Sequence, residues 1–521
     1  MATSRQFQER LRRAVREAVQ KCLAEGDLPE AQEGEACFTT IEALALAAGD
    51  AVSLEVFEQQ LAESGMGPPH CPHCGFEGQR IKQRERTLQT RRGLKVPLFE
   101  QECYCPGCRR AFFPRSQALG LEVDYDYSPT ALKKVVYAGT QATSFPQGSR
   151  DLNELAELDV TAERVRRATE RIGKERVAER DAQAAAYGAL PIPAQRSVPA
   201  DLPTPAVACV QMDGGRLQIF DRAEPQRNEE DTFWREMKVG CLWSMTSEVS
   251  AEDPCPRLPA SFVDPERMQR MVREIKGFSG PEASAEDEAE EPRIDERLGR
   301  PEPLARSVVA TRHEVETFGK LLASEAYQRR FPDAPRKAFV ADGSEANWGV
   351  WRRHFSDYVP ILDFIHALTY VYAAAMAGRA LKEGWHAYRQ WAQWTWSGQV
   401  DRVIADLELR QQELGEPTEE TSKTAPSAIV AMSLGYLRNQ RSRMDYPEYR
   451  KQGLPMTSTY VESTVKQINR RMKGTEKFWS RGVEPMLTLV ADHLSDTPTL
   501  ARFWRNRTRR QTGSRCVNQA A

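Results

Sequence analysis

The sequence predicts a multidomain α/β protein, and three observations support this fold class. The chain has 521 residues, several times the roughly 150 residues of an ordinary domain. Two Cys-x-x-Cys pairs lie in its first quarter, which is the spacing of a small metal-bound module. Further along, short apolar runs alternate with helical patterns, and some of these runs end at an aspartate, as strands of an α/β sheet often do.

The composition is that of an ordinary globular protein, with 40% hydrophobic and 28% charged residues. The sequence has no run of about eighteen apolar residues, and its N-terminal stretch lacks the apolar segment of a signal peptide. We therefore expect no membrane span and a cytoplasmic location. The formal net charge of −2 hides separate basic and acidic clusters, so a nucleic-acid partner is not excluded.

Residues 1–66 are predicted to form an N-terminal helical region. Apolar residues recur at every fourth position from Arg5 to Ala24, which is the pattern of an amphipathic helix. The segment from Ile41 to Ser64 predicts a further pair of helices. Their apolar faces can form a core within this chain or pair with a second protomer, and the sequence leaves both possibilities open.

Residues 67–116 are predicted to form a zinc ribbon. Cys71 and Cys74 form one Cys-x-x-Cys pair, Cys105 and Cys108 form the other, and the interval between them alternates as β-strands do. Four thiolates suit the tetrahedral coordination of a structural Zn²⁺. Reduced, metal-binding thiols are favoured over disulfides in a large chain without a signal peptide. A pair of thiol-rich hairpins without metal is the alternative. Cys103 is a spare thiol that could take the place of Cys105, and His70 and His73 are weaker candidates.

Residues 127–186 are predicted to be helical and to contain a helix-turn-helix between Arg150 and Gly173. The turn and the N-cap of the second helix fall at Val160-Thr161. The residues predicted to face inward are Leu152, Leu155, Ala156, Val165, Ala168 and Ile172. The arginines placed on the outer surface for DNA phosphates or base edges are Arg164, Arg166, Arg167 and Arg171. A charged helix that only keeps the protein in solution is the alternative.

Residues 187–205 are rich in Pro and Ala and predict a linker, and residues 206–500 predict a larger α/β domain. Val207 to Met212 is a strand that ends at Asp213-Gly214-Gly215, which indicates a hairpin with Leu217 to Phe220 returning. A third strand begins at Lys238. Three antiparallel strands with an acid on the first match the start of a ribonuclease-H-like sheet. Residues 279–304 are acidic and predict a mobile loop.

Two more candidate strands end at acids between Phe339 and Tyr372. The run Phe339–Ala341 is followed by Asp342, and the run Val359–Leu362 is followed by Asp363, with His366 one helical turn later. Carboxylates at the ends of adjacent buried strands are a common way for a sheet to present a metal site. The alternative for Asp342 is an ordinary Asp-Gly turn.

Residues 367–457 are predicted to form an all-helical insertion. The helices expected there are Ala367–Lys382, His386–Trp396, Val400–Leu414 and Ala428–Gln440. The tryptophans predicted to pack between helices, and not to stack on bases, are Trp385, Trp391, Trp394 and Trp396. A further helix follows the insertion, from Ser458 to Arg471.

This last helix offers a third carboxylate. Glu462 shares one side of the helix with basic residues at spacings of three or four, which are Lys466, Arg470 and Lys473. A carboxylate beside phosphate-binding bases suits cleavage of a nucleic acid. Glu476 is the second candidate, and a solvated helix charge is the alternative for Glu462. Residues 501–521 predict a basic tail that faces DNA or is disordered.

The three acids together suit a pair of divalent cations. Mg²⁺ or Mn²⁺ prefers oxygen ligands and needs several carboxylates that converge from different elements. Two such ions can activate a water or a 3′-hydroxyl and stabilise the leaving oxygen of a phosphodiester. Asp213, Asp342 and Glu462 are the predicted ligands.

The succession QMDGG, FVADG, PILDFIHALTYVYAAAM and YPEYRKQGLPMTSTYVESTVKQINRRMKGTEKFW resembles bacterial insertion-sequence DDE transposases of the Kra group, which are distantly similar to the Mutator superfamily. The resemblance implies a ribonuclease-H-like catalytic domain interrupted by a helical insertion. It also implies that Asp213, Asp342 and Glu462 are the three catalytic acids. Mutator-type enzymes have a Cys and a His after the second acid. Here Asp363 stands at the Cys, so its role, with that of His366, stays open.

The function implied by this resemblance is DNA transposition. The front half would bind the terminal inverted repeats, and the catalytic domain would cleave DNA strands and join them to target DNA. Because two DNA ends must be brought together, a homodimer or larger assembly on DNA is expected. Two alternatives remain: a non-catalytic DNA-binding repressor or decayed element-derived protein, and a metal-dependent nuclease without strand joining.

Overall fold

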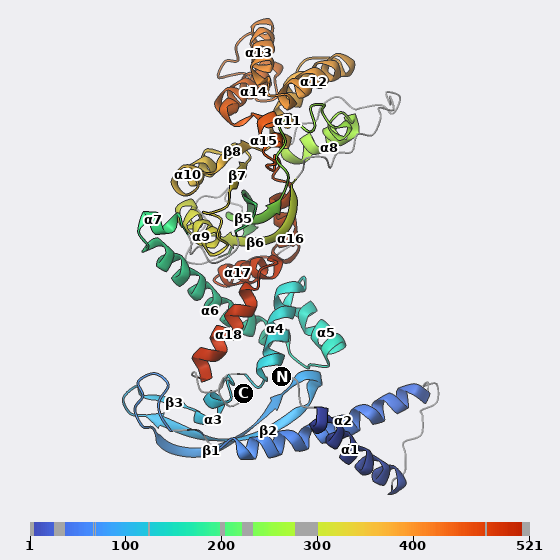
Figure 1. The fold of residues 1–521 in the computed structure, drawn as a ribbon, viewed down its shortest axis with the longest axis vertical. Helices are drawn as coiled ribbons and strands as arrows, with labels where there is room; N and C mark the ends of the chain where they lie inside the picture. The colour runs from blue at the N-terminus through green and yellow to red at the C-terminus, as the bar shows by residue number, and fades with distance from the viewer. Residues whose placement is uncertain are drawn as a thin grey trace. The chain divides into compact units, whose positions relative to one another are not determined.

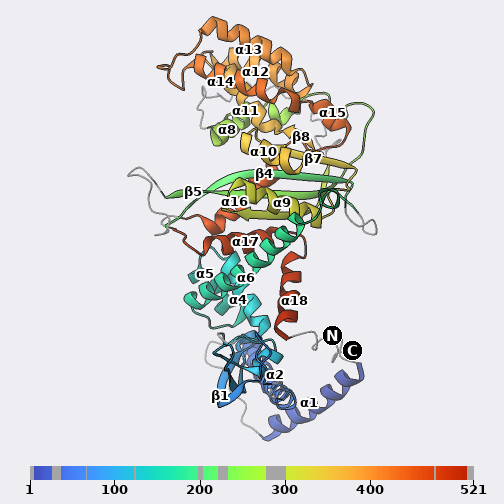
Figure 2. The same ribbon diagram turned by 90° about the vertical axis from the view of Figure 1, so that its left-hand side faces the viewer.

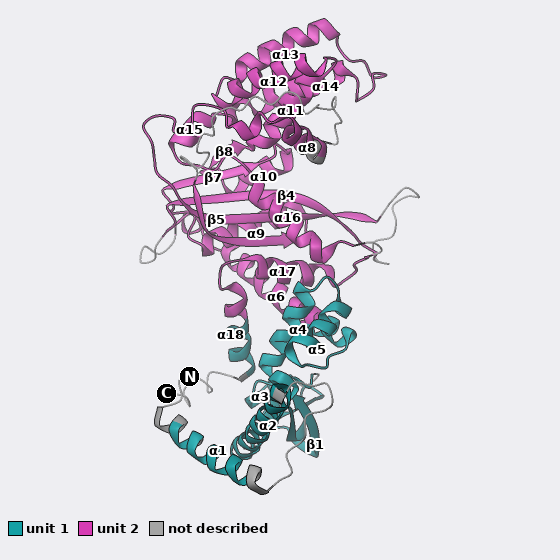
Figure 3. Cartoon of the chain, turned by 90° about the vertical axis from the view of Figure 1, so that its right-hand side faces the viewer, with its two compact units in different colours: residues 1–168, 504–521 teal, residues 169–503 magenta. Residues whose placement is uncertain are grey.

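The computed structural model describes residues 5–25, 37–65, 67, 69–122, 125–197, 204–220, 233–276, 301–474 and 477–512. The protein is a mixed α/β protein with two sheets (Figure 1). It divides into two compact units, one of Met1–Ala168 with Trp504–Ala521 and the other of Thr169–Phe503 (Figure 3). Most of the predicted acidic loop, the end of the predicted tail and Glu476 lie outside the described residues.

The first unit begins with two helices, α1 (Arg5–Glu25) and α2 (Cys37–Glu63). The predicted helical pair from Ile41 onward is wrong, because α2 is one continuous helix of 27 residues. Gly49 does not interrupt it. A Cβ at this position would meet nothing within 4 Å, so the glycine lies on an open surface of the helix.

A three-stranded antiparallel sheet follows, in the order β1-β2-β3. Its elements are β1 (Gln79–Gln89), the short helix η1 (Arg91–Gly93), β2 (Lys95–Cys105) and β3 (Arg110–Phe112). Leu88, Val96 and Leu98 are buried on one face, which explains the apolar alternation of this interval. The strands connect the two halves of the cysteine cluster described below.

Helices complete the first unit. They are α3 (Pro114–Ala118), α4 (Pro129–Gln141), α5 (Phe145–Ala156), the start of α6 (Ala162–Gly188) and the end of α18 (Thr499–Thr512). The predicted helix, turn and helix are present as α5 and α6, with Val160 buried in the turn. Leu155 was predicted to face inward and is 85% exposed, because Leu152 and the turn residue Leu158 occupy the inner side.

The second unit is built on a five-stranded sheet in the order β6-β5-β4-β7-β8 (Figure 2). The strands are β4 (Val207–Gln218), β5 (Trp234–Thr246), β6 (Glu302–Thr311), β7 (Arg336–Ala341) and β8 (Val359–Leu362). Strands β4, β7 and β8 are parallel to one another, whereas β5 is antiparallel to both β4 and β6. The carboxyl ends of β7 and β8 therefore lie at the same edge of the sheet.

The predicted hairpin at Asp213-Gly214-Gly215 is wrong. Strand β4 runs without a break, and Asp213, Gly214 and Gly215 pair with Val239, Lys238 and Met237 of β5. A Cβ at Gly215 would lie 2.5 Å from the Cε of Met237, so the absence of a side chain at residue 215 leaves room for this methionine. Asp213 therefore lies within a long ladder and not at a turn.

Helices cover both faces of this sheet. They include α9 (Val315–Gln328), α10 (Glu345–His354), α16 (Thr459–Met472) and α17 (Val483–Leu494), whereas α8 (Pro265–Lys276) packs on α11 (Phe364–Met376) of the helical insertion. Gly240 of β5 approaches Leu322 of α9, whereas the neighbouring Cys241 bonds to Thr464 of α16. Because successive residues of a strand face opposite sides, α9 and α16 lie on opposite faces.

The helical insertion is present between β8 and α16. Its elements are α11 (Phe364–Met376), α12 (Leu381–Trp396), α13 (Val400–Leu414), α14 (Pro426–Gln440), η3 (Arg441–Arg443) and α15 (Tyr446–Lys451). Trp391 and Trp396 are buried between helices, in agreement with their predicted packing role. Two short helices lie outside these groups, η2 (Ala260–Phe262) and α7 (Ile192–Gln195), the latter within the predicted linker.

The expectation for the C-terminal tail is corrected as far as residue 512. This segment belongs to helix α18, in which Phe503 and Trp504 are buried. Arg507 is buried as well and forms an ion pair with Glu122. Arg507 of the predicted basic tail thus has a structural role. Within the described residues, no helix is long and apolar enough to cross a membrane.

Candidate active site and cysteine cluster

Three aspartates lie at the same level on three adjacent strands. The β4–β7 ladder pairs Gln211 with Val340, so two residues further on it brings Asp213 beside Asp342. The β7–β8 ladder pairs Ala341 with Leu362, so the next residues are Asp342 and Asp363. Parallel strand ends at one edge are where α/β sheets bind ligands. The sheet itself therefore gathers the three carboxylates.

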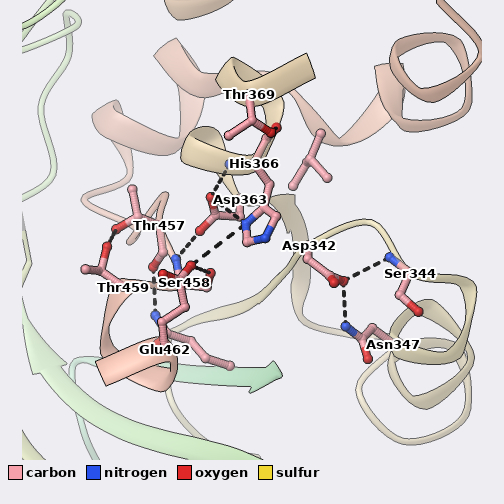
Figure 4. Close-up of polar contacts among 12 residues, drawn as sticks. Asp342, Ser344, Asn347, Asp363, His366, Thr369, Thr457, Ser458, Thr459 and Glu462 are labelled. Atoms are coloured by element: carbon pink, nitrogen blue, oxygen red, sulfur yellow. Dashed lines mark hydrogen bonds and ion pairs between the residues drawn. The ribbon is translucent and has the colours of Figure 1, made fainter. Parts of the chain in front are cut away.

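Asp342 is held by the turn that follows β7. Its Oδ1 accepts hydrogen bonds from the backbone N–H of Ser344 at 3.0 Å and from Nδ2 of Asn347 at 2.8 Å (Figure 4). The backbone oxygen of Asp342 accepts a bond of 2.6 Å from the hydroxyl of Tyr436 on α14. The inserted helices thus support the turn that carries this acid.

Asp363 is fully buried and both of its carboxylate oxygens are bonded. Oδ1 accepts the backbone N–H of His366 at 2.7 Å, which makes Asp363 the N-cap of α11. Oδ2 accepts the backbone N–H of Ser458, the residue just before α16. Asp363 therefore joins the end of β8, the start of α11 and the start of α16 (Figure 4).

Glu462 on α16 meets the same group of residues. Nδ1 of His366 lies 3.3 Å from Oδ1 of Asp363 and 3.9 Å from Oε1 of Glu462. The Oγ of Ser458 lies 3.3 Å from the same Oε1. Ligand atoms of Asp363, His366 and Glu462 are all within 4.8 Å of one another.

The electrostatics of the site are those of crowded acids. Burial raises the pKa of Asp213, and the neighbouring charges of Asp342 and Asp363 add to this effect. Burial and the charge of Asp363 likewise raise the pKa of Glu462. Burial would lower the pKa of His366, but the bond to Asp363 and the surrounding carboxylates raise it to about 9. His366 is therefore an imidazolium among four acids.

Asp363 is the exception among these acids. Burial alone would raise its pKa, but hydrogen bonds from His366 and Ser458 outweigh burial and hold the pKa below its ordinary value. Asp363 is therefore a carboxylate beside the protonated His366, and Asp213, Asp342 and Glu462 lie near this pair with further carboxyl oxygens. Such an oxygen-rich site suits hard divalent cations.

The structure groups the predicted residues somewhat differently from the sequence. Asp213 and Asp342 lie beside each other on the adjacent strands β4 and β7. The charge of Asp342 raises the pKa of Asp213, and the charge of Asp213 raises the pKa of Glu462. The tightest group of possible ligands, however, is Asp363, His366 and Glu462. Asp363 and His366 were left without a role by the sequence, although the spacing Asp-x-x-His after a strand was a visible signal.

The predicted basic residues of α16 lie on the accessible side of that helix. Lys466 and Arg470 are exposed, and Lys473 is half-buried with its Nζ 5.6 Å from the ring centre of Trp234. Among the arginines of α6, Arg164 and Arg167 are exposed, whereas Arg166 and Arg171 are half-buried.

Arg166 and Arg167 both bond to Glu163 at 2.7 Å and 2.6 Å. These two arginines lower the pKa of Glu163 to about 2. Their charges are thus partly neutralised within the helix, and the charge of Arg164 acts on the neighbouring Tyr127.

The four predicted zinc ligands of the first unit form a single cluster. The Sγ atoms of Cys71, Cys74, Cys105 and Cys108 lie within 4.8 Å of one another, and those of Cys74 and Cys105 are 3.5 Å apart. The backbone N–H of Cys108 donates to the Sγ of Cys105 at 3.4 Å. Such a set of four sulfurs can hold one tetrahedral Zn²⁺.

Other thiols and histidines of this region stand outside the cluster. Cys103 is buried in the same small core but pairs with Phe112 in the β2–β3 ladder. His70 and His73 are not among the clustered ligands of the described residues. Burial would raise the pKa of Cys71, but backbone N–H groups of His73 and Cys74 bring it to about 7. A thiolate, the metal-binding form, is therefore accessible near neutral pH.

Comparison of the chain with protein-family models and with curated proteins finds no match.

Proposed function

We propose that this protein is a DDE transposase that binds the ends of an insertion sequence and catalyses metal-dependent cleavage and transfer of DNA strands. The observation on which this rests is the alignment of Asp213, Asp342 and Asp363 at one edge of the sheet, with Glu462 supplied by α16. Four acids from four elements are more than a stable fold needs. Their crowding favours a catalytic metal site.

The order and direction of the strands support a ribonuclease-H-like catalytic domain. Three antiparallel strands, β6, β5 and β4, continue into two parallel ones, β7 and β8. The first acid lies on the central strand, and the second ends the adjacent parallel strand. The all-helical segment separates the second acid from Glu462, which is also the arrangement implied by the resemblance to insertion-sequence transposases.

The proposed chemistry divides between the chain and two divalent ions. Asp213, Asp342 and Glu462 would hold Mg²⁺ or Mn²⁺, which would activate the attacking hydroxyl and stabilise the leaving oxygen. Asp363, with no free oxygen facing solvent, positions His366 and the start of α16. Lys466 and Arg470 are exposed one and two turns beyond Glu462, where they would bind phosphates of the strand.

Recognition of the element ends belongs, in this proposal, to the first unit. The cysteine cluster would hold a structural Zn²⁺ and so fix the ribbon, and the exposed arginines of α6 would meet the DNA backbone or base edges. Target DNA would be a second DNA partner, and a homodimer or larger assembly would bring two ends together.

The test is strand cleavage and joining with a duplex that carries the DNA flanking the gene, in Mg²⁺. Asp213→Asn, Asp342→Asn and Glu462→Gln keep the side-chain shapes but remove the charges, and each is expected to lower cleavage by about 10²-fold or more. Glu345→Gln is the matched control, because this exposed acid lies three residues after Asp342 and should leave cleavage unchanged.

The outcomes separate the proposed function from its alternatives. If the folded wild-type protein binds the flanking duplex but never cuts it, the protein is a non-catalytic DNA-binding repressor. Cleavage without joining of the 3′-hydroxyl to target DNA identifies a nuclease. Full activity in any one of the three acid variants removes that residue from the site.

A further inference from the structure

Several large aromatic side chains are exposed together at one end of the catalytic sheet. Phe220 is 53% exposed, Phe478 is 48% exposed and Trp234 is 38% exposed. Ring centres of Phe220 and Phe233 are 5.5 Å apart, and those of Phe233 and Phe478 are 6.1 Å apart. We call Phe220, Phe233, Trp234 and Phe478 the aromatic cluster. Trp234 directly follows Phe233 in the chain, and exposed apolar side chains that gather in this way mark interaction sites.

The backbone holds this cluster rigidly. Three chain segments converge there, because the N–H of Ile219 donates to the oxygen of Phe233 at 2.9 Å and the N–H of Phe220 donates to the oxygen of Trp479 at 2.8 Å. Phe233 has a φ of 60°, a left-handed conformation that is rare for a bulky side chain. Such strained residues concentrate at functional sites.

The cluster extends beyond the neighbouring strands on the side of the active site. Strand β7 pairs with β4 only as far as Gln211, so the stretch of β4 from Asp213 to Gln218 continues past the end of β7 (Figure 2). Phe220 and Trp234 lie at the far end of this extension. The aromatic cluster therefore lies beyond the carboxyl end of β7, which is the end of the sheet that carries the acids.

A row of basic residues on α16 links the acids to the cluster. Glu462, Lys466, Arg470 and Lys473 follow one another at spacings of four, four and three, so they fall within about 80° of the helix circumference. The row ends at Trp234, over whose ring the Nζ of Lys473 lies at 5.6 Å. From Glu462 to Lys473 the helix rises by about 16 Å.

The ligand that matches a row of cations ending in exposed rings is a nucleic-acid strand with unpaired bases. Phosphates match the cations, and base faces match the rings, as in proteins that bind single strands. In a duplex the base faces are covered by neighbouring base pairs, so stacking requires an unpaired strand. Stacked nucleotides are spaced by about 3.4 Å and those of an extended strand by more, so the 16 Å row spans at most about five nucleotides.

We propose that the aromatic cluster stacks unpaired DNA bases within about five nucleotides of the phosphate that reacts. The inference rests on the proposed function for the identity of that phosphate. It adds that the catalytic unit binds an opened DNA end, and not only a duplex, with Trp234 and Phe478 as the stacking surfaces.

The first test measures binding without chemistry. Fluorescence anisotropy with labelled dT20 and with a 20-base-pair duplex, in buffer without Mg²⁺, Mn²⁺ or chelator, excludes metal-dependent cleavage from the readout and leaves bound zinc in place. Trp234→Ala and Phe478→Ala are each expected to weaken binding of dT20 about fivefold or more and binding of the duplex less than about twofold. Wild-type protein that does not bind dT20, or an equal loss for both probes, overturns the proposal.

Two further variants separate stacking from general loss of apolar surface. Trp234→Leu keeps an apolar side chain without an aromatic face, and it is expected to behave like Trp234→Ala. Leu409→Ala removes a 59% exposed side chain from α13 and should leave dT20 binding unchanged. Unfolding curves show whether each variant is folded. Wild-type affinity in Trp234→Leu contradicts stacking.

The second test maps the contact on the wild-type protein. A flanking duplex with a single-stranded end carries one 5-iododeoxyuridine at successive positions, and irradiation links it to a stacked ring. Links to Trp234 or Phe478 are expected within about five nucleotides of the cleaved phosphate, and links only to other residues contradict the proposal. If the acid variants abolish cleavage while the ring variants change nothing, stacking fails and the proposed function stands.

Discussion

At the scale of single residues, Asp363 is where three elements of the candidate site meet. Its two oxygens accept backbone N–H groups of His366 and Ser458, which lie on either side of the inserted helices. The fully buried carboxylate is thus occupied by the fold. Of the four acids, it is the one best suited to position the others.

Asp363→Asn tests this positioning role. An amide offers one acceptor oxygen where the carboxylate offers two, so one buried N–H loses its partner at a cost of about 1–3 kcal/mol. We expect the free energy of unfolding, measured in urea, to fall by this amount. Cleavage at saturating DNA should fall as well, with DNA affinity unchanged.

The matched control for that substitution is Asp357→Asn. Asp357 forms an ion pair with Lys337 at 2.6 Å, but its side chain is 43% exposed, and exposed pairs contribute at most about 1 kcal/mol. Wild-type stability and cleavage in Asp363→Asn would show that the carboxylate does not fix the start of α16.

Residue-scale signals also explain what the sequence predicted about the acids. Asp342 and Asp363 follow short apolar runs, and this local pattern was sufficient to predict two strands that end in carboxylates. The role of Asp363 was not predictable, because its partner Ser458 is 95 positions away. Hydrogen bonds between such distant segments leave no periodic pattern in the sequence.

At the scale of elements, the contact between α6 and α17 depends on a glycine. A Cβ on Gly173 would lie 2.7 Å from the Cβ of Pro485 and 2.9 Å from its backbone oxygen. These distances are shorter than van der Waals contact and involve backbone, so the helices approach as closely as they do because residue 173 has no side chain.

Gly173→Ala should therefore destabilise the protein by about 1–3 kcal/mol through overpacking. Gly349→Ala, in α10, is the opposite case, since a Cβ there meets nothing within 4 Å. This second substitution should stabilise the protein by about 0.5–1 kcal/mol, because alanine favours the helix. Urea unfolding of both variants provides the measurement, and equal effects would contradict the packing argument.

Elements were predictable where their signals are local. The strand Val359–Leu362 and the helix Val400–Leu414 have the predicted bounds. The prediction of a hairpin at Gly214-Gly215 was wrong because strand pairing with Lys238 and Met237 of β5 outweighs the turn preference of the glycines. The prediction that Leu155 is buried was wrong because two residues beyond the helix, Leu158 and Val160, fill the inner side to which the helical period had assigned it.

At the scale of the whole molecule, the chain forms two compact units, each with a core of its own. The cysteine cluster lies entirely in the first unit, and the four acids lie entirely in the second. A change that disrupts the four clustered thiols should therefore destabilise one unit without altering the other.

Cys105→Ser is expected to reduce bound zinc from one equivalent to less than about half, with loss of order in the first unit. Cys103→Ser is the matched control, because Cys103 is equally buried in the same core but is not part of the cluster. Metal analysis measures the zinc, and limited proteolysis with mass mapping locates the disorder. Equal zinc in both variants would contradict the four-thiolate site.

The position of α14 ties the helical insertion to the chemistry of the site. Tyr436 and Gln440 on this helix donate to the backbone oxygens of Asp342 and Gly343. Gly343 has a φ of 94°, and a Cβ there would lie 2.8 Å from the hydroxyl of Tyr436. The turn that carries the second acid therefore depends on α14, so a change that displaces this helix removes two hydrogen bonds from the turn at Asp342.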